Sequence, residues 1–129
     1  DPAGPERTLL NRFLTAGAAL PWVWGVSDCT IWVADWCVLH FRHDPAAAFR
    51  GMYDDEAGAE RLIAAGLGHA IAHWMPPLRL TDAPRRGDVG IIDIRGREVA
   101  AIWTGRRWAF RTPRGLGECP ARAIISWGH

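Results

Sequence analysis

The sequence predicts an α+β domain in which a helical half is followed by short antiparallel strands. Two observations predict this class: apolar residues recur at helical spacing in the first half, and short β-rich runs separated by glycines follow Asp88. A length of 129 residues suits one hydrophobic core. We therefore predict a single domain over residues 1–129, mainly helical over 1–78 and mainly strands over 79–129.

Two longer helices are predicted first. Apolar residues at helical spacing indicate a helix that starts at Pro5 and closes at Gly17. Ser27 and Asp28 are good N-caps, so a second helix is predicted to start at Cys29. Its apolar stripe is broad, and we expect it to be the central helix; the stripe consists of Cys29, Trp32, Val33, Trp36, Cys37 and His40.

Three shorter helices are predicted before the strands. Asp44-Pro45 favours the start of an Ala-rich helix that ends near Gly51. Acidic residues 54–56 favour a helix that runs to Gly66. One or two further turns are expected over residues 68–74, before the two prolines at 76 and 77.

Four strands are predicted in the second half. They form a meander packed on the Cys29 helix, with Gly96, Gly105 and a loop over residues 113–120 as the breaks between them. The predicted strands are Val89–Ile94, Val99–Trp103, Arg107–Arg111 and Ile124–Trp127.

Composition excludes several function classes. A net charge of +1 with scattered arginines gives no field for nucleic acid, so no nucleic-acid specificity is expected. No apolar run approaches the ~18 to 20 residues of a membrane span. Three cysteines without a C-x-x-C pair predict free thiols and no cofactor or metal. Most of the eight tryptophans should lie in the core, with one or two lining a cleft or a partner surface.

Cys29 is the candidate nucleophile, and Asp28 is the helix cap beside it. A thiol at a helix N-terminus meets the positive end of the dipole and unpaired N–H groups, which favour the thiolate. The alternative is a small buried residue on the apolar stripe. Both interpretations stay open on the sequence alone.

No histidine is well placed as the base that such a thiol requires. His40 lies eleven residues along the same helix, roughly 16 Å away, and His43 is expected to be a cation at the helix C-terminus. His69 and His73 share an i, i+4 spacing but lack a third metal ligand, so an exposed helix face is favoured. His129, the last residue, is a poor base unless a partner fixes it.

The other polar candidates are expected to be structural. Asp88 fits a turn at a strand entrance, and Asp93 fits a solvent-facing strand position. Cys37 should be buried, and Cys119 should lie in the loop before Pro120.

Two motifs together resemble the signatures of NlpC-type, papain-like cysteine peptidases. They are Trp24-Gly25-x-x-Asp28-Cys29 at a helix start and Arg86-Gly87-Asp88-Val89 at a strand start, and the likeness covers roughly residues 8 to 127. A phage and prophage tail-tip branch of that superfamily is similar at further positions: Ala34-Asp35-Trp36, Asp44-Pro45, Gly51-x-Tyr53, Gly115-Leu116 and Ala123 to Trp127. The resemblance implies a Cys-bearing helix packed on an antiparallel sheet.

The chain departs from that family where the catalytic histidine should lie. The family carries it at the start of an H-V-G-I-x-x-G strand, and the best match here starts at Val99. An aliphatic side chain cannot accept the thiol proton, so the standard dyad is absent. Glu98 is adjacent, but neighbouring strand residues face opposite sides of a sheet.

Three functions follow as hypotheses. The first is a tail-tip or hub protein of a phage or phage-like particle, structural or a degenerate hydrolase, that partners other virion proteins. The second is an active cysteine peptidase that cuts peptidoglycan to help DNA cross the cell wall. A redox or metal-binding module is the third. The first two place the protein in the virion tail tip or a prophage, after synthesis in the bacterial cytoplasm.

Overall fold

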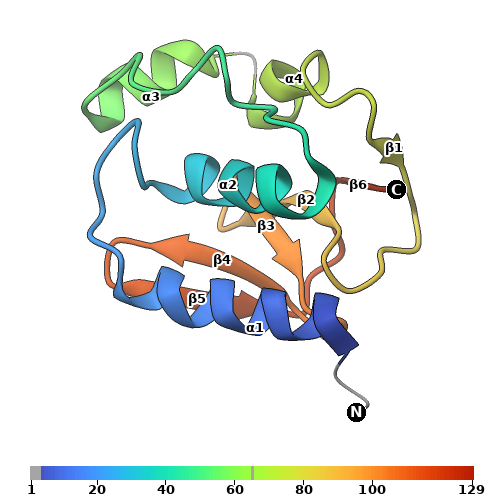
Figure 1. Ribbon diagram of the computed structural model, residues 1–129. Helices are drawn as coiled ribbons and strands as arrows, with labels where there is room; N and C mark the ends of the chain where they lie inside the picture. The colour runs from blue at the N-terminus through green and yellow to red at the C-terminus, as the bar shows by residue number, and fades with distance from the viewer. Residues whose placement is uncertain (1–3, 65) are drawn as a thin grey trace.

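The computed structural model describes residues 4–64 and 66–129, and it confirms an α+β fold (Figure 1). Residues 1–3 and 65 of the predicted domain lie outside the described part. The helices are α1 (Gly4–Ala19), α2 (Cys29–Phe41), α3 (Glu56–Leu62) and α4 (Leu67–Ala72). The strands are β1 (Arg79–Leu80), β2 (Val89–Ile94), β3 (Arg97–Trp103), β4 (Trp108–Thr112), β5 (Gly115–Cys119) and β6 (Ile125–Gly128).

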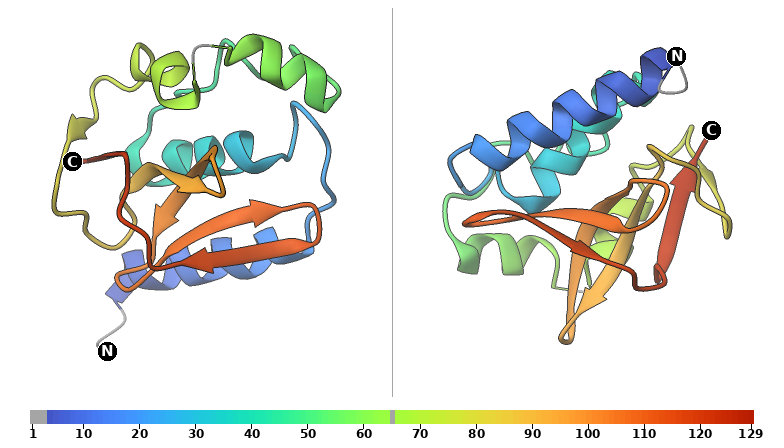
Figure 2. Two further views of the ribbon diagram at one scale, coloured as in Figure 1. Left: turned by 180° about the vertical axis from the view of Figure 1, so that it is seen from behind. Right: turned by 90° about the horizontal axis from the view of Figure 1, so that it is seen from below.

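All six strands form one antiparallel sheet in the order β1-β6-β2-β3-β4-β5. Strands β2, β3 and β4 are the first three strands of the predicted meander, and β5, which was not predicted, pairs next to β4. The fourth predicted strand, Ile124–Trp127, corresponds to β6 and does not continue the meander. The C-terminal strand β6 instead crosses to the free edge of β2, where Val89 pairs with Trp127. Helices α1 and α2 lie on the same side of this sheet (Figure 2).

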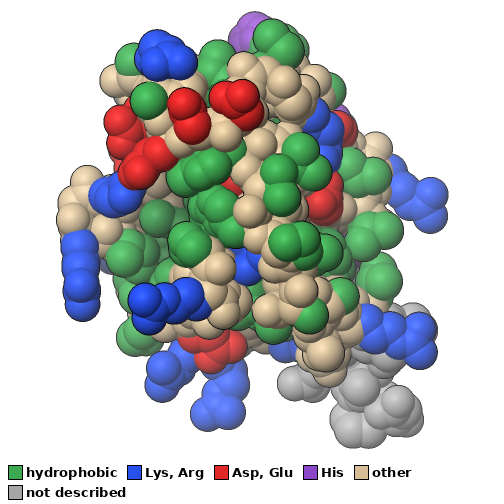
Figure 3. All heavy atoms as spheres, turned by 90° about the vertical axis from the view of Figure 1, so that its left-hand side faces the viewer, with side chains coloured by type: hydrophobic (Ala, Val, Ile, Leu, Met, Phe, Trp, Pro, Cys, Tyr) green, Lys and Arg blue, Asp and Glu red, His purple; other side chains and the backbone are tan. Residues whose placement is uncertain are grey.

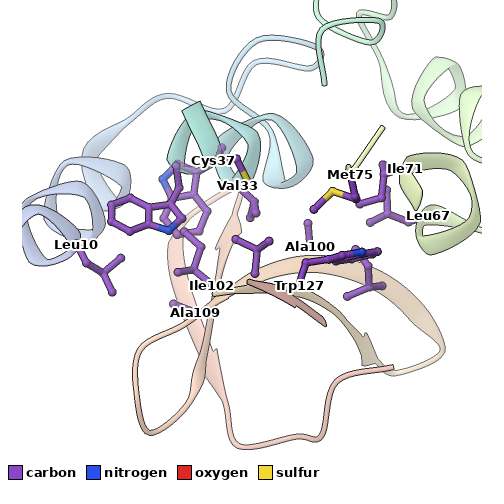
Figure 4. Close-up of a cluster of buried hydrophobic side chains, with 14 residues drawn as sticks. Leu10, Val33, Cys37, Leu67, Ile71, Met75, Ala100, Ile102, Ala109 and Trp127 are labelled. Atoms are coloured by element: carbon purple, nitrogen blue, oxygen red, sulfur yellow. The ribbon is translucent and has the colours of Figure 1, made fainter. Parts of the chain in front are cut away.

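The main core lies between that sheet face and the helices. Figure 4 shows side chains from α1, α2, α4 and the strands meeting there, with Val33 and Cys37 of α2 above Ala100 and Ile102 of β3. Four of the eight tryptophans are buried, namely Trp32, Trp36, Trp108 and Trp127. The Trp36 ring N–H donates to the Gly87 carbonyl at 2.7 Å, so even its polar atom is satisfied.

Helix α2 is central, as predicted, because both of its sides are covered. One side packs on the sheet, and the other buries Ile31 and Ala34 against Ala46 of the following loop. The helix ends at Arg42, whose backbone is left-handed (φ 59°). None of the helices in the described part of the chain is long and apolar enough to cross a membrane.

The predicted Ala-rich helix after Asp44 is wrong. Residues 45–51 form successive turns, with the Phe49 and Arg50 N–H groups both donating to the Ala46 carbonyl. The Gly51 N–H then donates across to Gly25 at 2.9 Å instead of back along a helix. Tertiary hydrogen bonding therefore wins over local helix propensity.

The predicted loop over residues 113–120 is also wrong, because it contains strand β5. This strand was not predicted because it contains Gly115 and Gly117, and glycine is rare inside strands. A Cβ on Gly117 would lie 2.5 Å from the Phe110 ring, so the aromatic side chain of β4 occupies the space that glycine leaves. Cys119, expected in a loop, is the last residue of β5.

Gly90 of β2 lies where the sheet is too tightly packed for a larger residue. A Cβ there would lie 2.8 Å from the Trp108 ring and 2.9 Å from the Ile125 carbonyl oxygen. Both contacts are too short, and moving either the buried ring or the backbone would cost free energy. We expect Gly90→Ala to lower the free energy of unfolding by about 1–3 kcal/mol in urea titration. Gly68→Ala in α4 is the control, because its nearest neighbours lie at 3.6 Å. Equal stability of the two variants would contradict this packing.

Candidate functional site

A buried carboxylate fixes the start of α2. Asp28 is 1% exposed and caps the helix, with Oδ1 accepting from the Ile31 N–H at 3.0 Å. Its Oδ2 accepts from the Gly25 N–H at 2.8 Å and from the Tyr53 hydroxyl. The predicted cap is therefore confirmed, and three donors replace the water that a buried carboxylate loses.

The same carboxylate holds two loops together. Gly25 has a left-handed backbone (φ 79°), and a Cβ there would lie 2.3 Å from the Tyr53 carbonyl oxygen. Only glycine fits this close approach between the loop before α2 and the loop before α3. Burial and the hydrogen bond to Asp28 raise the pKa of Tyr53, so the phenol stays protonated and donates.

Cys29 is confirmed as the first residue of α2, but the expected thiolate is not favoured. Burial, followed by the charge of Asp28, raises the pKa of the Cys29 thiol from 9.0 to about 11. The Thr30 hydroxyl lies 3.9 Å from Sγ and opposes this only weakly. The helix dipole argument was wrong here because the sulfur is buried, and because the cap that starts the helix places a negative charge beside it.

Cys29 lines a pocket of about 360 Å³ between the start of α2, helix α3 and strands β3 and β4. Four aromatic side chains contribute to its wall, so two of the eight tryptophans line a cleft, as expected. These aromatic residues are Trp22, Trp24, Tyr53 and Phe110. Figure 3 shows the side of the molecule with α3 at the top, where acidic side chains lie above a group of exposed hydrophobic side chains.

Ion pairs cross the rim of this pocket. Arg97 of β3 lies 2.9 Å from Glu56 and 3.6 Å from Glu60, both on α3. These side chains are more than half exposed, so the pairs contribute little to stability. Glu98 accepts from the Gly68 N–H at 2.9 Å and thereby links β3 to α4.

The position expected to match the family histidine faces away from α2. Val99 packs against the cluster of Ile92, Ala101 and Trp108, which contains no residue of α2. Its neighbours Ala100 and Ile102 belong to the core that includes α2, and strand alternation places Glu98 on that side as well. The prediction that Glu98 and Val99 face opposite sides of the sheet was correct. The side assigned to each was wrong, because Glu98 and not Val99 lies on the side of α2. Both residues still line the Cys29 pocket.

Among the described residues that line this pocket there is no histidine. His40 stacks on Trp36 and meets His129 at the other end of α2, with ring centroids 4.8 and 5.3 Å apart. His43 instead contacts the Trp74 carbonyl oxygen at 2.6 Å. His69 and His73 are exposed, as expected. The described residues contain no group of three metal-binding side chains.

The two aspartates of the sheet lie as expected. Asp88 accepts from the Arg85 N–H at 2.8 Å in the turn before β2, and Asp93 is exposed and accepts from Gly96. Burial raises the pKa of Asp88. Cys37 is buried, as predicted.

Sequence reasoning missed three residues of the site: Tyr53, Trp22 as a pocket residue, and Arg111. Arg111 is 2% exposed and donates to the carbonyl oxygens of Leu20, Thr112 and Gly115. In the sequence it is one arginine among many at a strand end. Only the pairing of β4 with β5 and the return of the α1–α2 loop bury it.

Removing the Asp28 carboxylate should be costly. Asp28→Ala removes a helix cap and leaves the Gly25 N–H and the Tyr53 hydroxyl without their acceptor. We expect the free energy of unfolding to fall by about 2–4 kcal/mol in urea titration. Asp55→Ala is the matched control, because Asp55 caps α3 through one bond to Gly58 and is exposed; it should cost about 1 kcal/mol. Similar losses in both variants would refute the central role of Asp28.

The raised pKa makes Cys29 a slow nucleophile. Because only the thiolate reacts, alkylation of Cys29 by iodoacetamide at pH 8 should be about 100-fold slower than in urea-unfolded chain, and should rise about tenfold per pH unit up to about pH 11. Peptide mapping by mass spectrometry follows Cys29 separately from the other two cysteines. A rate that already levels off below pH 8 would show an activated thiolate and overturn this assignment.

Of three comparisons with known proteins, one gave a match. No curated protein and no solved structure matched it. A family model described as a domain of unknown function, DUF6950, matches residues 5–127, nearly the whole chain. The chain therefore belongs to the DUF6950 family.

Proposed function

We propose that this chain is a structural tail-tip or hub protein of a phage or phage-like particle, which keeps an NlpC-like, papain-like fold as a degenerate hydrolase. In this role the Cys29 pocket binds a segment of a partner virion protein and catalyses nothing. The protein would be made in the bacterial cytoplasm and act in the virion.

One observation carries the non-catalytic part of the proposal. The only thiol on the pocket wall, among the described residues, has a pKa of about 11 and no histidine beside it in the pocket. Cysteine catalysis needs a thiolate near neutral pH or a base that produces one. The tail-tip part of the proposal rests on the resemblance of the Asp28-Cys29 and Gly87-Asp88 motifs to the phage branch of the NlpC-type superfamily.

An active peptidoglycan peptidase is the second candidate, and one observation favours it. Cys29 lies at a helix start on the wall of a pocket, which is the position that a nucleophile requires. Such activity would need a base from a neighbouring chain in the assembled particle, together with removal of the two causes that raise the thiol pKa.

Peptidoglycan digestion separates the two candidates. Purified peptidoglycan is incubated with wild-type protein or Cys29→Ala, and released peptides are measured by mass spectrometry. We expect equal release at the background level for both proteins, because a protonated thiol without a base does not attack an amide. An active NlpC-type endopeptidase serves as the positive control. Release by the wild type that Cys29→Ala abolishes would refute the structural role and establish the hydrolase.

A further inference from the structure

We propose that the Cys29 pocket binds a basic side chain, lysine or arginine, from an extended segment of a partner protein. The aliphatic stem of that side chain lies on the aromatic wall of the pocket, and its charge meets the acidic rim. This inference names the partner chemistry of the pocket and rests on the proposed role of that pocket in binding.

The aromatic wall is open to a ligand. Trp22, Trp24, Tyr53 and Phe110 all line the pocket, and each of them is partly exposed. The two tryptophan rings meet edge to face, with their centres 5.2 Å apart and their planes at 87°. Aromatic rings pack well against the aliphatic stems of basic side chains and attract the cation at the end. A volume of about 360 Å³ lies within the range of ligand pockets.

The carboxylates of the rim are within reach of a ligand. The side chains of Glu56 and Glu60 on α3 are 53% and 64% exposed, and Glu98 of β3 is also exposed. Glu98 bonds to the Gly68 N–H, but among the described residues it forms no ion pair. An incoming cation therefore finds one carboxylate that no cation of the described chain neutralises.

The charges that line the pocket favour a cation. Two arginines and four carboxylates among the described residues line it, which leaves a net charge of −2, whereas the whole chain carries +1. The buried pair, Asp28 and Arg111, is hydrogen-bonded within the protein. The accessible charges are then three glutamates against Arg97. Such complementarity selects a cationic group over a neutral or anionic one.

Arg97 shows that the rim accepts this chemistry. Its guanidinium lies 2.9 Å from Glu56 and 3.6 Å from Glu60, and its side chain is 66% exposed. A basic side chain of the protein's own thus already occupies part of the rim from the solvent side. It competes with a ligand cation for the same two carboxylates, so its removal should strengthen binding of the ligand.

Exposed apolar residues beside the pocket indicate a protein segment instead of a small amine. Leu20, Val23 and Val26 belong to the loop that carries the two pocket tryptophans, and they are 42%, 44% and 59% exposed. Met52, 66% exposed, follows Gly51, whose N–H bonds to this loop. Figure 3 shows such hydrophobic side chains below the acidic ones. The residues on either side of the bound basic side chain would cover this surface, which a free amine would leave in water.

The test titrates ¹⁵N-labelled protein with tripeptides whose ends are blocked: Ac-Ala-Lys-Ala-NH₂, Ac-Ala-Arg-Ala-NH₂, Ac-Ala-Glu-Ala-NH₂ and the norleucine peptide Ac-Ala-Nle-Ala-NH₂. Norleucine keeps a stem like that of lysine without the charge. We expect the lysine and arginine peptides to shift the Trp24 indole resonance, which Trp24→Phe assigns. The norleucine peptide should bind about fivefold more weakly, and the glutamate peptide more weakly still.

Three variants locate the charge that is recognised. Glu98→Gln keeps an oxygen for the Gly68 N–H and removes the charge, so it should weaken binding of the lysine peptide about threefold. Arg97→Gln removes the competitor and should strengthen that binding about threefold. Glu118→Gln is the matched control, because Glu118 is exposed on β5 and does not line the pocket; it should change nothing.

Several results would overturn the inference. They are equal or tighter binding of the norleucine or glutamate peptide, no binding of any peptide, or weaker binding after Arg97→Gln. The peptide H-Ala-Nle-Ala-NH₂ has a free amino end, and tighter binding of it than of the lysine peptide would replace the side chain by a chain terminus. None of these titrations measures peptide release, so the non-catalytic role is decided separately by peptidoglycan digestion.

Discussion

The buried Asp28 carboxylate is the interaction on which the site depends. It starts α2, holds the tight turn at Gly25 and accepts from Tyr53, and so it fixes the helix and two loops at one point. Because α2 is covered on both sides, its start also sets where Cys29 lies relative to the sheet. Cap, loop closure and pocket geometry are therefore consequences of one side chain.

Burial, together with the same carboxylate, decides the chemistry of the neighbouring thiol. A helix N-terminus favours an anion by about 0.3–1 kcal/mol. The rise of the Cys29 pKa from 9.0 to about 11 corresponds to about 3 kcal/mol in the opposite direction, so burial and the Asp28 charge outweigh the dipole. The buried cation of Arg111, which lies over the Trp22 ring, also lines the pocket.

The sheet separates two environments that the sequence does not distinguish. One face carries Val89, Ile91, Ala100 and Ile102 toward the helices, and the other carries Ile92, Ala101 and Trp108 in a second cluster. Both faces are apolar, so hydrophobic alternation along β3 is weak and gives no sign of which residue faces α2. The exchange of Glu98 and Val99 in the family-based prediction follows directly from this ambiguity.

The sequence by itself determined the fold class, α2 with its Asp28 cap, and strands such as Val89–Ile94, because caps, periodicity and β-rich runs are local signals. It also predicted that some tryptophans line a cleft. Only the tertiary structure decided that residues 45–51 form turns instead of a helix, that Gly115–Cys119 pairs as a strand, and that Arg111 is buried beside Trp22. The raised pKa of Cys29 was likewise decided only by the tertiary structure. Each of these depends on groups distant in the chain, through backbone pairing, desolvation or charge at short range, and local sequence carries no record of such neighbours.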